Sequence, residues 1–247
     1  LANPYLKPRI AYAHERSAGV EIFDRAGEWV GIFPPQNFPD HSAGGELPED
    51  HVAVAPRAIP PIWLKCLTHL EDREWDDMSR AVGFDPFAIL KAAYANVFGE
   101  QSRGASTLVM QIARMLRGMQ PGRHESLASK AMRKLVELTD AQVLADMFRA
   151  GDPQRLGEQY LAMHLPLAYG PKGSGFGPSL YGIVITSRIA FGQAPEALAA
   201  ERQAVLAAAV KHQIVFAPPG DAAAAGLAEK KWRRVKQRAD RCLREAF

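Results

Sequence analysis

The sequence predicts a mainly α-helical fold with a small β-hairpin near its start, on two observations. Residues 20–24 and 29–33 are short runs rich in β-branched and aromatic residues, and Gly27 lies in the segment between them, which suits a hairpin turn. From Ile62 onward, apolar residues recur every three or four positions, which indicates amphipathic helices. The chain has 247 residues, 47% of them hydrophobic, enough to bury a core.

The helices are expected to fill the second of two parts of the chain. Residues 1–60 should hold the hairpin and a Pro-, Gly- and acid-rich connecting loop, and residues 61–247 the helical domain. A Gly-rich segment at 170–177 lacks the Gly-Lys-Ser/Thr ending of a phosphate-binding loop, so we do not expect a nucleotide cradle there. The expected helices begin near Ile62, cover 84–97, begin again at Leu108 and at Leu127, and cover 154–163, 180–190, 197–212 and 222–247.

Composition and charge exclude several classes of protein. The net charge of +3 suits an anionic ligand or a membrane surface, but most Lys and Arg side chains simply face solvent. The seven histidines form no His-Glu-x-x-His pattern and no Cys/His pairing, which argues against a zinc site. The longest apolar run, from Ala204 to Val210, is far shorter than the ~20 residues that a spanning helix needs.

The two cysteines, Cys66 and Cys242, both fall within helical apolar patterns. We therefore favour two buried free thiols over a disulfide. The cysteines then do not indicate whether the protein acts in an oxidising or a reducing compartment. The chain begins at Leu1 with neither a start methionine nor a signal peptide, and we expect it to be a piece of a longer protein.

Glu71 lies at the border of the apolar stripe of the first helix. It follows Leu67 by one turn, and we expect Trp75 one turn later on the same helix. A carboxyl group beside apolar and aromatic surface is desolvated, which raises its pKa toward the range of a general base. Asp72 and Glu74 are close by, and this local pattern on its own favours a surface glutamate at a charged helix end.

Residues 104–107, Gly-Ala-Ser-Thr, are typical of a helix N-terminus with Ser106 or Thr107 as the cap. Such a terminus can also bind an anion through its free N–H groups. Gln111 and Arg114 then share one polar face of the helix. Taken alone, this pattern favours an ordinary cap followed by two solvated polar residues.

A third polar group lies on one flank of the helix that begins at Leu127. Lys130, Arg133, Lys134 and Glu137 are spaced by three and four, so they meet on that flank. The cations could hold a departing pyrophosphate, and the alternative is a salt-bridged exposed face. The residues expected to face the core instead are Leu127, Ala131, Leu135 and Leu138.

The last expected helix is strongly basic. Nucleic acid is not an expected partner, because no aromatic residue beyond Trp232 interleaves with the cations. The favoured interpretation is a solvated helix packed through Val235, Ala239 and Leu243. Its cations are Lys230, Lys231, Arg233, Arg234, Lys236, Arg238 and Arg241.

The order and spacing of these segments resemble the peptidoglycan glycosyltransferase domain of class A penicillin-binding proteins and monofunctional transglycosylases, glycosyltransferase family 51. That family carries Glu-Asp-x-x-Phe, Gly-x-Ser-Thr-Ile-x-Gln-Gln, Arg-Lys-x-x-Glu and Glu-x-Tyr-Leu-Asn. Met110 replaces the first Gln of the second motif, Ala162 replaces the Asn of the fourth, and the family's His-x-Gly element is absent. The segments that resemble the family are 71–75, 104–111, 133–137, 158–162, 181–183 and 190–192.

The resemblance implies a lysozyme-like, bilobal helical fold that polymerises lipid II, an undecaprenyl-pyrophosphate-linked disaccharide-pentapeptide. By motif, Glu71 would be the general base on the acceptor 4-hydroxyl, and Glu137 would assist departure of the lipid pyrophosphate. A divalent cation, Mg²⁺ or Mn²⁺, would offset phosphate charge, with Glu71 and Asp72 as its candidate ligands. The substrate-binding residues carried over by motif are Asp72, Ser106, Thr107, Gln111, Arg114, Lys130, Arg133 and Lys134.

The resemblance also implies a place and partners. The domain would act at the outer, periplasmic face of the bacterial cytoplasmic membrane, with its membrane anchor missing from this piece of the chain. Its partners would be lipid II, the growing glycan strand, the membrane surface and a transpeptidase or cell-wall assembly protein. Two alternatives stay open: a catalytically impaired relative that binds a lipid-linked precursor or a cell-wall partner, and a lytic glycosidase, which would have no phosphate for the cations to hold.

Overall fold

The computed structural model describes residues 20–33, 54–72, 75, 106–116, 126–149, 153–169, 180–216 and 222–247. The helix expected at 84–97 and the Gly-rich segment at 170–177 lie outside the described residues. Within the described part, the chain forms seven α-helices and two small sheets. The predicted fold class, mainly α with a small hairpin near the start, is confirmed.

The predicted hairpin is formed by β1 (Val20–Phe23) and β2 (Trp29–Phe33), which pair antiparallel. The Asp24 carboxylate closes the turn by accepting hydrogen bonds at 2.8 Å from the backbone N–H groups of Ala26 and Glu28. Gly27 adopts φ 83°, a conformation that glycine reaches without strain.

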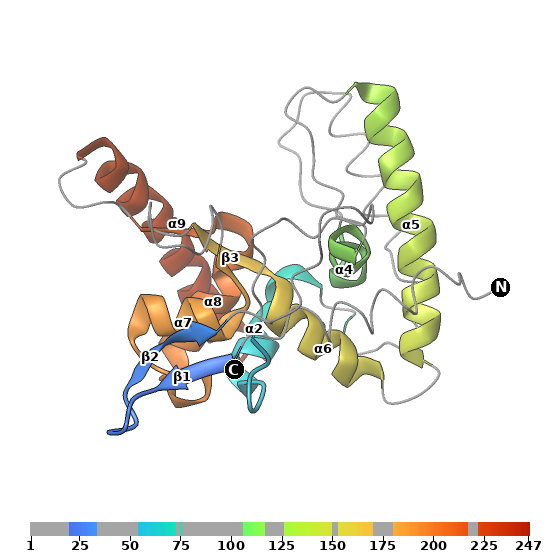
Figure 1. Ribbon diagram of the computed structural model, residues 1–247. Coiled ribbons are helices and arrows are strands. Elements are labelled where there is room, and N and C mark those ends of the chain that lie inside the picture. Colours follow the sequence, from blue (N-terminus) through green and yellow to red (C-terminus); the bar gives the residue numbers. More distant parts are fainter. Residues whose placement is uncertain are drawn as a thin grey trace.

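The hairpin belongs to one of two groups of elements (Figure 1). In this group α8 (Ala200–His212) lies between α2 (Pro61–Glu71) and α9 (Ala222–Glu245) and contacts both, with α7 (Ile183–Phe191) beside it. Small side chains let helices approach closely, because the interaxial distance depends on the residues at the contact. The fully buried alanines of α8 are Ala204, Ala207, Ala208 and Ala209.

The second group contains α4 (Leu108–Leu116) and α5 (Leu127–Arg149), which pack against each other (Figure 1). Between the groups runs α6 (Pro153–His164), which contacts α4 and α5 on one side and α7 on the other. The face of α4 predicted to be apolar is buried, whereas Gln111 and Arg114 are partly exposed, as expected.

A three-stranded sheet that the sequence did not predict joins α6 to the first group. Its central strand is β3 (Pro166–Tyr169), which pairs antiparallel with β4 (Leu180–Tyr181) and parallel with β5 (Ile214–Val215). The helix expected over 180–190 was therefore wrong at its start. Gly182, at φ 74°, separates β4 from α7.

Two further helix predictions need correction. Residues 195–197 form a short 3-10 turn, so α8 begins at Ala200 and not at residue 197. The predicted core-facing side of α5 was wrong in part: Leu138 packs against the core as expected, but Leu135 is 60% exposed and the side chain of Glu137 is fully buried. The side chains of Leu127 and Ala131 lie outside the described residues. The polar flank of α5 faces inward because cations on the same helix and on α4 neutralise the buried carboxylate.

The prediction of free thiols was wrong as well. Cys66 on α2 and Cys242 on α9 form a disulfide with a Cα–Cα distance of 5.7 Å. Both residues are buried, as expected. They face each other at the contact between α2 and α9. Separation by 176 residues in sequence gave no sign of this proximity.

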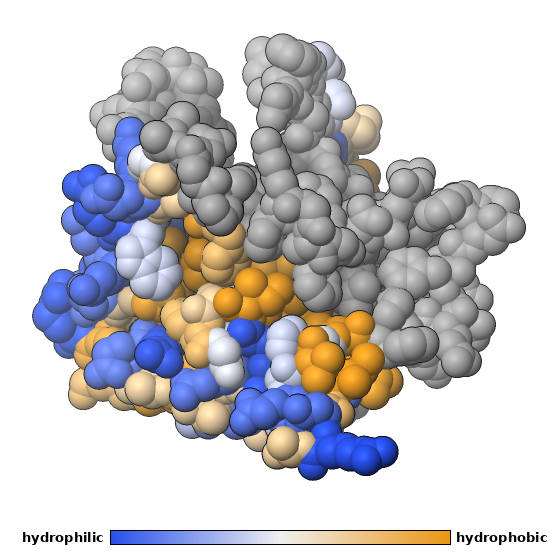
Figure 2. All heavy atoms as spheres, turned by 60° about the vertical axis from the view of Figure 1, so that its left-hand side comes forward, coloured by the Kyte–Doolittle hydropathy of each residue, from blue (hydrophilic) through white to orange (hydrophobic). Residues whose placement is uncertain are grey.

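The surface of the first group of elements carries both hydrophilic and apolar residues. Figure 2 brings forward the side that carries α9 and the hairpin, and hydrophilic residues form much of its outer edge while apolar residues gather further in. The basic side chains of α9 contribute to the exposed polar surface, and Val235 and Ala239 are buried as predicted. Among the described helices, none combines the length and the apolar character needed to cross a membrane.

Candidate active site

The first motif lies where α2 ends. Glu71 is the last residue of the helix, and Asp72 leaves it in an extended conformation, with its N–H still donating to the Thr68 carbonyl at 2.9 Å. Trp75 is buried but lies beyond the helix end, so the expected continuation of α2 to Trp75 was wrong. Glu71 is thus held at a helix terminus beside a change of chain direction.

Glu71 is 14% exposed and faces a cation from the other end of the chain. A guanidinium N–H of Arg238, on α9, donates to the Glu71 carboxylate at 2.5 Å, and the same nitrogen donates to the Leu70 carbonyl at 2.9 Å. Arg238 is itself only 9% exposed. The guanidinium therefore binds the carboxylate and satisfies a carbonyl at the C-terminal end of α2.

The pKa of Glu71 is raised above its usual value. Burial is the largest cause, and it outweighs the attraction of Arg238 and Lys211 and a side-chain hydrogen bond from Gln111, which all lower the pKa. The sequence had predicted desolvation of this carboxyl group, and the burial confirms it. A carboxylate with a raised proton affinity is suited to accept a proton from a hydroxyl group.

Arg238 is a residue of this candidate site that sequence reasoning did not single out. The basic residues of α9 were interpreted as one solvated face, and most of them are exposed. One signal distinguished Arg238: it lies three residues after Val235 and four before Cys242, on the stripe that packs inward. An arginine on the apolar stripe of a helix needs a buried acceptor, and Glu71 is that acceptor.

The second motif begins α4 and is tied to the first. The Asp72 carboxylate accepts a hydrogen bond from the Leu108 N–H at 2.9 Å, and the Thr107 hydroxyl accepts one from the Met110 N–H at 3.2 Å. The prediction that Ser106 or Thr107 caps this helix is confirmed for Thr107. Two of the free N–H groups of the helix start are thereby satisfied within the chain.

Glu137 lies at the centre of a cluster of cations. Its carboxylate accepts hydrogen bonds from Arg114 at 3.0 and 3.2 Å, from Arg133 at 2.7 Å and from Lys134 at 2.7 Å. The Ser106 hydroxyl lies at the same place, 3.0 Å from the Lys134 ammonium. The second and third motifs therefore meet around one buried carboxylate, which we call the Glu137 cluster.

The Glu137 cluster has an electrostatic character opposite to that of Glu71. Burial raises the pKa of Glu137, but the hydrogen bonds and charges of Arg114 and Lys134 outweigh it and hold the pKa below its usual value. Burial also lowers the pKa of Lys134, partly offset by Glu137. Three cations surround this carboxylate, and the lysine among them is 42% exposed.

A polar pocket of ≈ 320 Å³ adjoins the end of α2. The pocket gives space for a ligand next to the Glu71 carboxyl group. Its lining comes from the last turn of α2 and the last turns of α9: His69, Leu70, Glu71, Asp72, Arg241 and Glu245.

Over residues 42–240 the chain matches the family described as Transglycosylase. The chain belongs to this transglycosylase family. The resemblance predicted from the motifs is thus confirmed, and membership assigns the chain to glycosyl transfer in peptidoglycan. No curated protein matches the chain.

Two positions at which apolar residues replace polar residues of the family motifs lie in the core of this transglycosylase. Met110 is 1% exposed, and Ala162 is fully buried. Their side chains therefore pack against the interior. The polar residues that remain, Ser106 and Gln111, are the ones that lie close to the two glutamates.

The expected divalent cation finds no ready site in the described part of the transglycosylase. No group of three or more His, Cys, Asp or Glu residues there could hold a metal ion. Of the two candidate ligands, Glu71 binds Arg238 and Asp72 binds the Leu108 N–H. Lys130 lies on α5, but its side chain is outside the described residues.

Proposed function

We propose that this domain polymerises lipid II into glycan strands, with Glu71 as the general base. In this mechanism the Glu71 carboxylate removes the proton of the acceptor 4-hydroxyl, whose oxygen attacks the anomeric carbon of the donor. The Glu137 cluster assists departure of the undecaprenyl pyrophosphate. The observation that carries the proposal is the coexistence of one buried carboxylate with a raised pKa and a second that is surrounded by three cations.

The environment of Glu71 supports the role of base. A base near neutral pH needs a proton affinity above that of an ordinary carboxylate, and burial supplies it. Arg238 and Gln111 fix the carboxylate through hydrogen bonds, which limits its rotation. The adjoining polar pocket leaves space for the hydroxyl-bearing sugar.

The Glu137 cluster supports binding of the leaving group. Arg114, Arg133 and Lys134 converge on a single carboxylate, which places three cationic groups together. The pyrophosphate gains negative charge on the oxygen that linked it to the anomeric carbon as the C–O bond breaks, and fixed cations stabilise that charge. Glu137 would hold the cations in position, which is a more specific role than the direct assistance expected from the motif alone.

Several expectations remain part of this proposal. The disulfide supports action in an oxidising compartment, such as the periplasmic side of the cytoplasmic membrane. The growing glycan strand, the membrane surface and a transpeptidase or cell-wall assembly protein are the proposed partners, as for a penicillin-binding protein. A divalent cation, if used, would act on the substrate pyrophosphate, because the described residues form no site of their own.

Incubation of the protein with labelled lipid II, followed by gel separation of the products, tests the proposal. We expect glycan strands from the wild-type protein and none from Glu71→Gln. Binding of lipid II without turnover, unchanged by Glu71→Gln, would instead support the catalytically impaired relative. Release of soluble fragments from purified cell walls would support a lytic glycosidase.

A further inference from the structure

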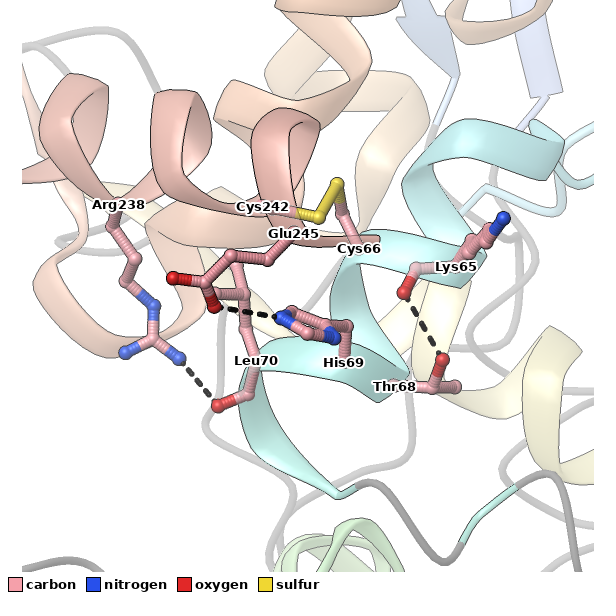
Figure 3. The surroundings of a disulfide bond; sticks show 8 residues. All are labelled: Lys65, Cys66, Thr68, His69, Leu70, Arg238, Cys242 and Glu245. Atoms are coloured by element: carbon pink, nitrogen blue, oxygen red, sulfur yellow. Dashed lines mark hydrogen bonds and ion pairs between the residues drawn. A yellow bond between two sulfur atoms is a disulfide. The ribbon is translucent and has the colours of Figure 1, made fainter. Parts of the chain in front are cut away.

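A series of contacts joins the helices α2 and α9 close to Glu71, and Figure 3 shows the contacts around the disulfide. The Cys66–Cys242 disulfide is the covalent member of this series. His69 and Glu245 form an ion pair at 3.2 Å, and Arg238 donates to the Leu70 carbonyl and to Glu71. The same two helices thus carry the disulfide and both members of the Glu71–Arg238 pair.

The disulfide lies one helical turn from that pair on each helix. Cys66 precedes Leu70 by four residues and Glu71 by five, and Cys242 follows Arg238 by four. At about 1.5 Å of rise per residue, the disulfide is therefore about 6–8 Å from the pair along either helix axis. Any sliding or tilting of α9 against α2 near Glu71 must also move the two cysteines.

The other contacts across this interface are weaker restraints. Glu245 is 47% exposed, so its contact with His69 is partly solvated and holds the two helices only weakly. Lys65 lies 4.1 Å from the ring of Phe247, at the exposed C-terminal end of the chain. The Arg238 side chain is long, so its ion pair could persist through small helix movements while the position of Glu71 changed.

We propose that the Cys66–Cys242 disulfide positions Glu71 against Arg238 for catalysis, beyond its contribution to overall stability. The inference rests on the proposed function of Glu71 as general base. Cys66 and Cys242 are thereby positioning residues, since neither touches the substrate. A displacement of about 1 Å at a reacting group can reduce the rate by about a hundredfold, so a covalent restraint one turn away has a catalytic consequence.

The test uses substitution, because both sulfur atoms belong to fully buried residues that a reductant cannot reach without local opening. The main variant is Cys66→Ala/Cys242→Ala, and Cys66→Ala/Cys242→Val is a second variant that fills more of the space left by the sulfurs. The matched control is Glu21→Gln, which removes the 2.8 Å ion pair between the hairpin and Arg188 and so perturbs stability far from Glu71. All proteins are studied well below their melting temperatures.

The first measurement is the pKa of the Glu71 carboxyl group, followed by carbon NMR and assigned with Glu71→Gln. Loss of the restraint should let solvent reach the carboxyl group, and burial is the largest cause of its raised pKa. We expect the pKa to fall toward its usual value in both cysteine variants and to stay unchanged in Glu21→Gln. An unchanged Glu71 pKa in a folded cysteine variant overturns the proposal.

The second measurement is lipid II polymerisation. We expect kcat to fall about tenfold in the cysteine variants with little change in KM, while Glu21→Gln keeps the wild-type kcat. The added effect of Arg238→Gln should be smaller in the cysteine variants than in the wild type, because the pair is already misplaced. Equal kcat in the wild type and a cysteine variant contradicts the inference.

These outcomes separate the two proposals. If the Glu71 pKa falls in the cysteine variants but no protein makes glycan, then the positional effect is real and the proposed function fails. If the wild type makes glycan and the cysteine variants match it in both measurements, the proposed function stands and the disulfide has only a structural role.

Discussion

The Asp72 carboxylate accepts a hydrogen bond from the Leu108 N–H at 2.9 Å, across 36 positions of sequence. Asp72 directly follows Glu71 at the end of α2, and Leu108 is the first residue of α4, which leads to the Glu137 cluster through Arg114. One hydrogen bond therefore joins the segment that carries the proposed base to the segment that carries the proposed leaving-group cations. It fixes the orientation of α4 relative to the end of α2.

Glu71→Gln should abolish most turnover while leaving the fold intact. A glutamine has nearly the same shape and can still contact Arg238 but cannot accept a proton, and general-base catalysis is worth about 10²–10⁴-fold. We expect kcat for lipid II polymerisation to fall at least about a hundredfold. Glu229→Gln, which removes an exposed ion pair with Arg233 on α9, is the control and should keep wild-type activity.

Glu71→Gln should also make stability less sensitive to rising pH. Because the folded-state pKa of Glu71 is raised, its favourable contribution is present below the unfolded-state value, near 4.5, and is lost as pH rises through the folded-state pKa. Relative to the wild type, the variant should gain stability between pH 4 and pH 7. Urea unfolding at both pH values measures this, and a constant difference would show that burial of Glu71 carries no cost.

Glu137→Gln should show the opposite pH dependence. The pKa of Glu137 is lowered, so its contribution is present above the unfolded-state value and is lost as pH falls through the folded-state pKa. We expect a loss of about 3 kcal/mol at pH 7, the low end for a broken buried ion pair, because its cations are partly solvated. The loss should shrink toward pH 3. Equal losses at both pH values would indicate that packing, not charge, explains the burial of this carboxylate.

Thr107→Ala should destabilise the protein by about 1 kcal/mol through loss of the α4 cap. The matched control is Thr139→Ala, at an exposed position in the middle of α5. Its hydroxyl group donates to the backbone carbonyls of Leu135 and Val136 in the same helix. Because alanine has the higher helix propensity, this change should be neutral or slightly stabilising. Chemical denaturation of both variants gives the comparison, and equal losses would exclude a capping role for Thr107.

The hairpin, the cap of α4 and the family could be predicted from the sequence. Gly27 and Asp24 specify a turn among neighbouring residues, and Thr107 precedes the helix that it caps. Both features depend on local patterns, so a short window of the chain is enough to predict them. The family was predicted from the order of motifs along the chain, which needs no knowledge of the fold.

The misses share a different cause: each depends on residues that are distant in sequence. Arg238 meets Glu71 across 167 positions, and Cys66 meets Cys242 across 176. The inward face of α5 was wrong because a buried carboxylate is acceptable only when Arg114, on another helix, helps to neutralise it. The spacing of apolar residues along one helix cannot indicate a partner that lies on another helix.

Two substitutions, Gly182→Ala and Gly192→Ala, distinguish two reasons why a position requires glycine. One reason is a backbone conformation that other residues rarely adopt, and the other is a lack of space for a Cβ atom. Both residues have a positive φ, 74° at Gly182 and 67° at Gly192. Gly192 lies in the left-handed α region, which costs an alanine about 1–2 kcal/mol, whereas Gly182, with ψ 161°, lies in a region that is essentially restricted to glycine and costs other residues about 1–3 kcal/mol. At Gly192 a Cβ atom would meet nothing within 4 Å, so the backbone cost should be the whole effect.

At Gly182 a Cβ atom would lie 2.5 Å from the Met163 carbonyl oxygen and 2.9 Å from that of Ala162, so the backbone of α6 would have to move. We therefore expect Gly182→Ala to lose at least about 3 kcal/mol, the added loss coming from overpacking. Because β4 also pairs with β3 here, the displacement should reach the sheet that links α6 to the first group. Urea denaturation of both variants measures the difference, and equal destabilisation would mean that α6 does not approach Gly182 closely in solution.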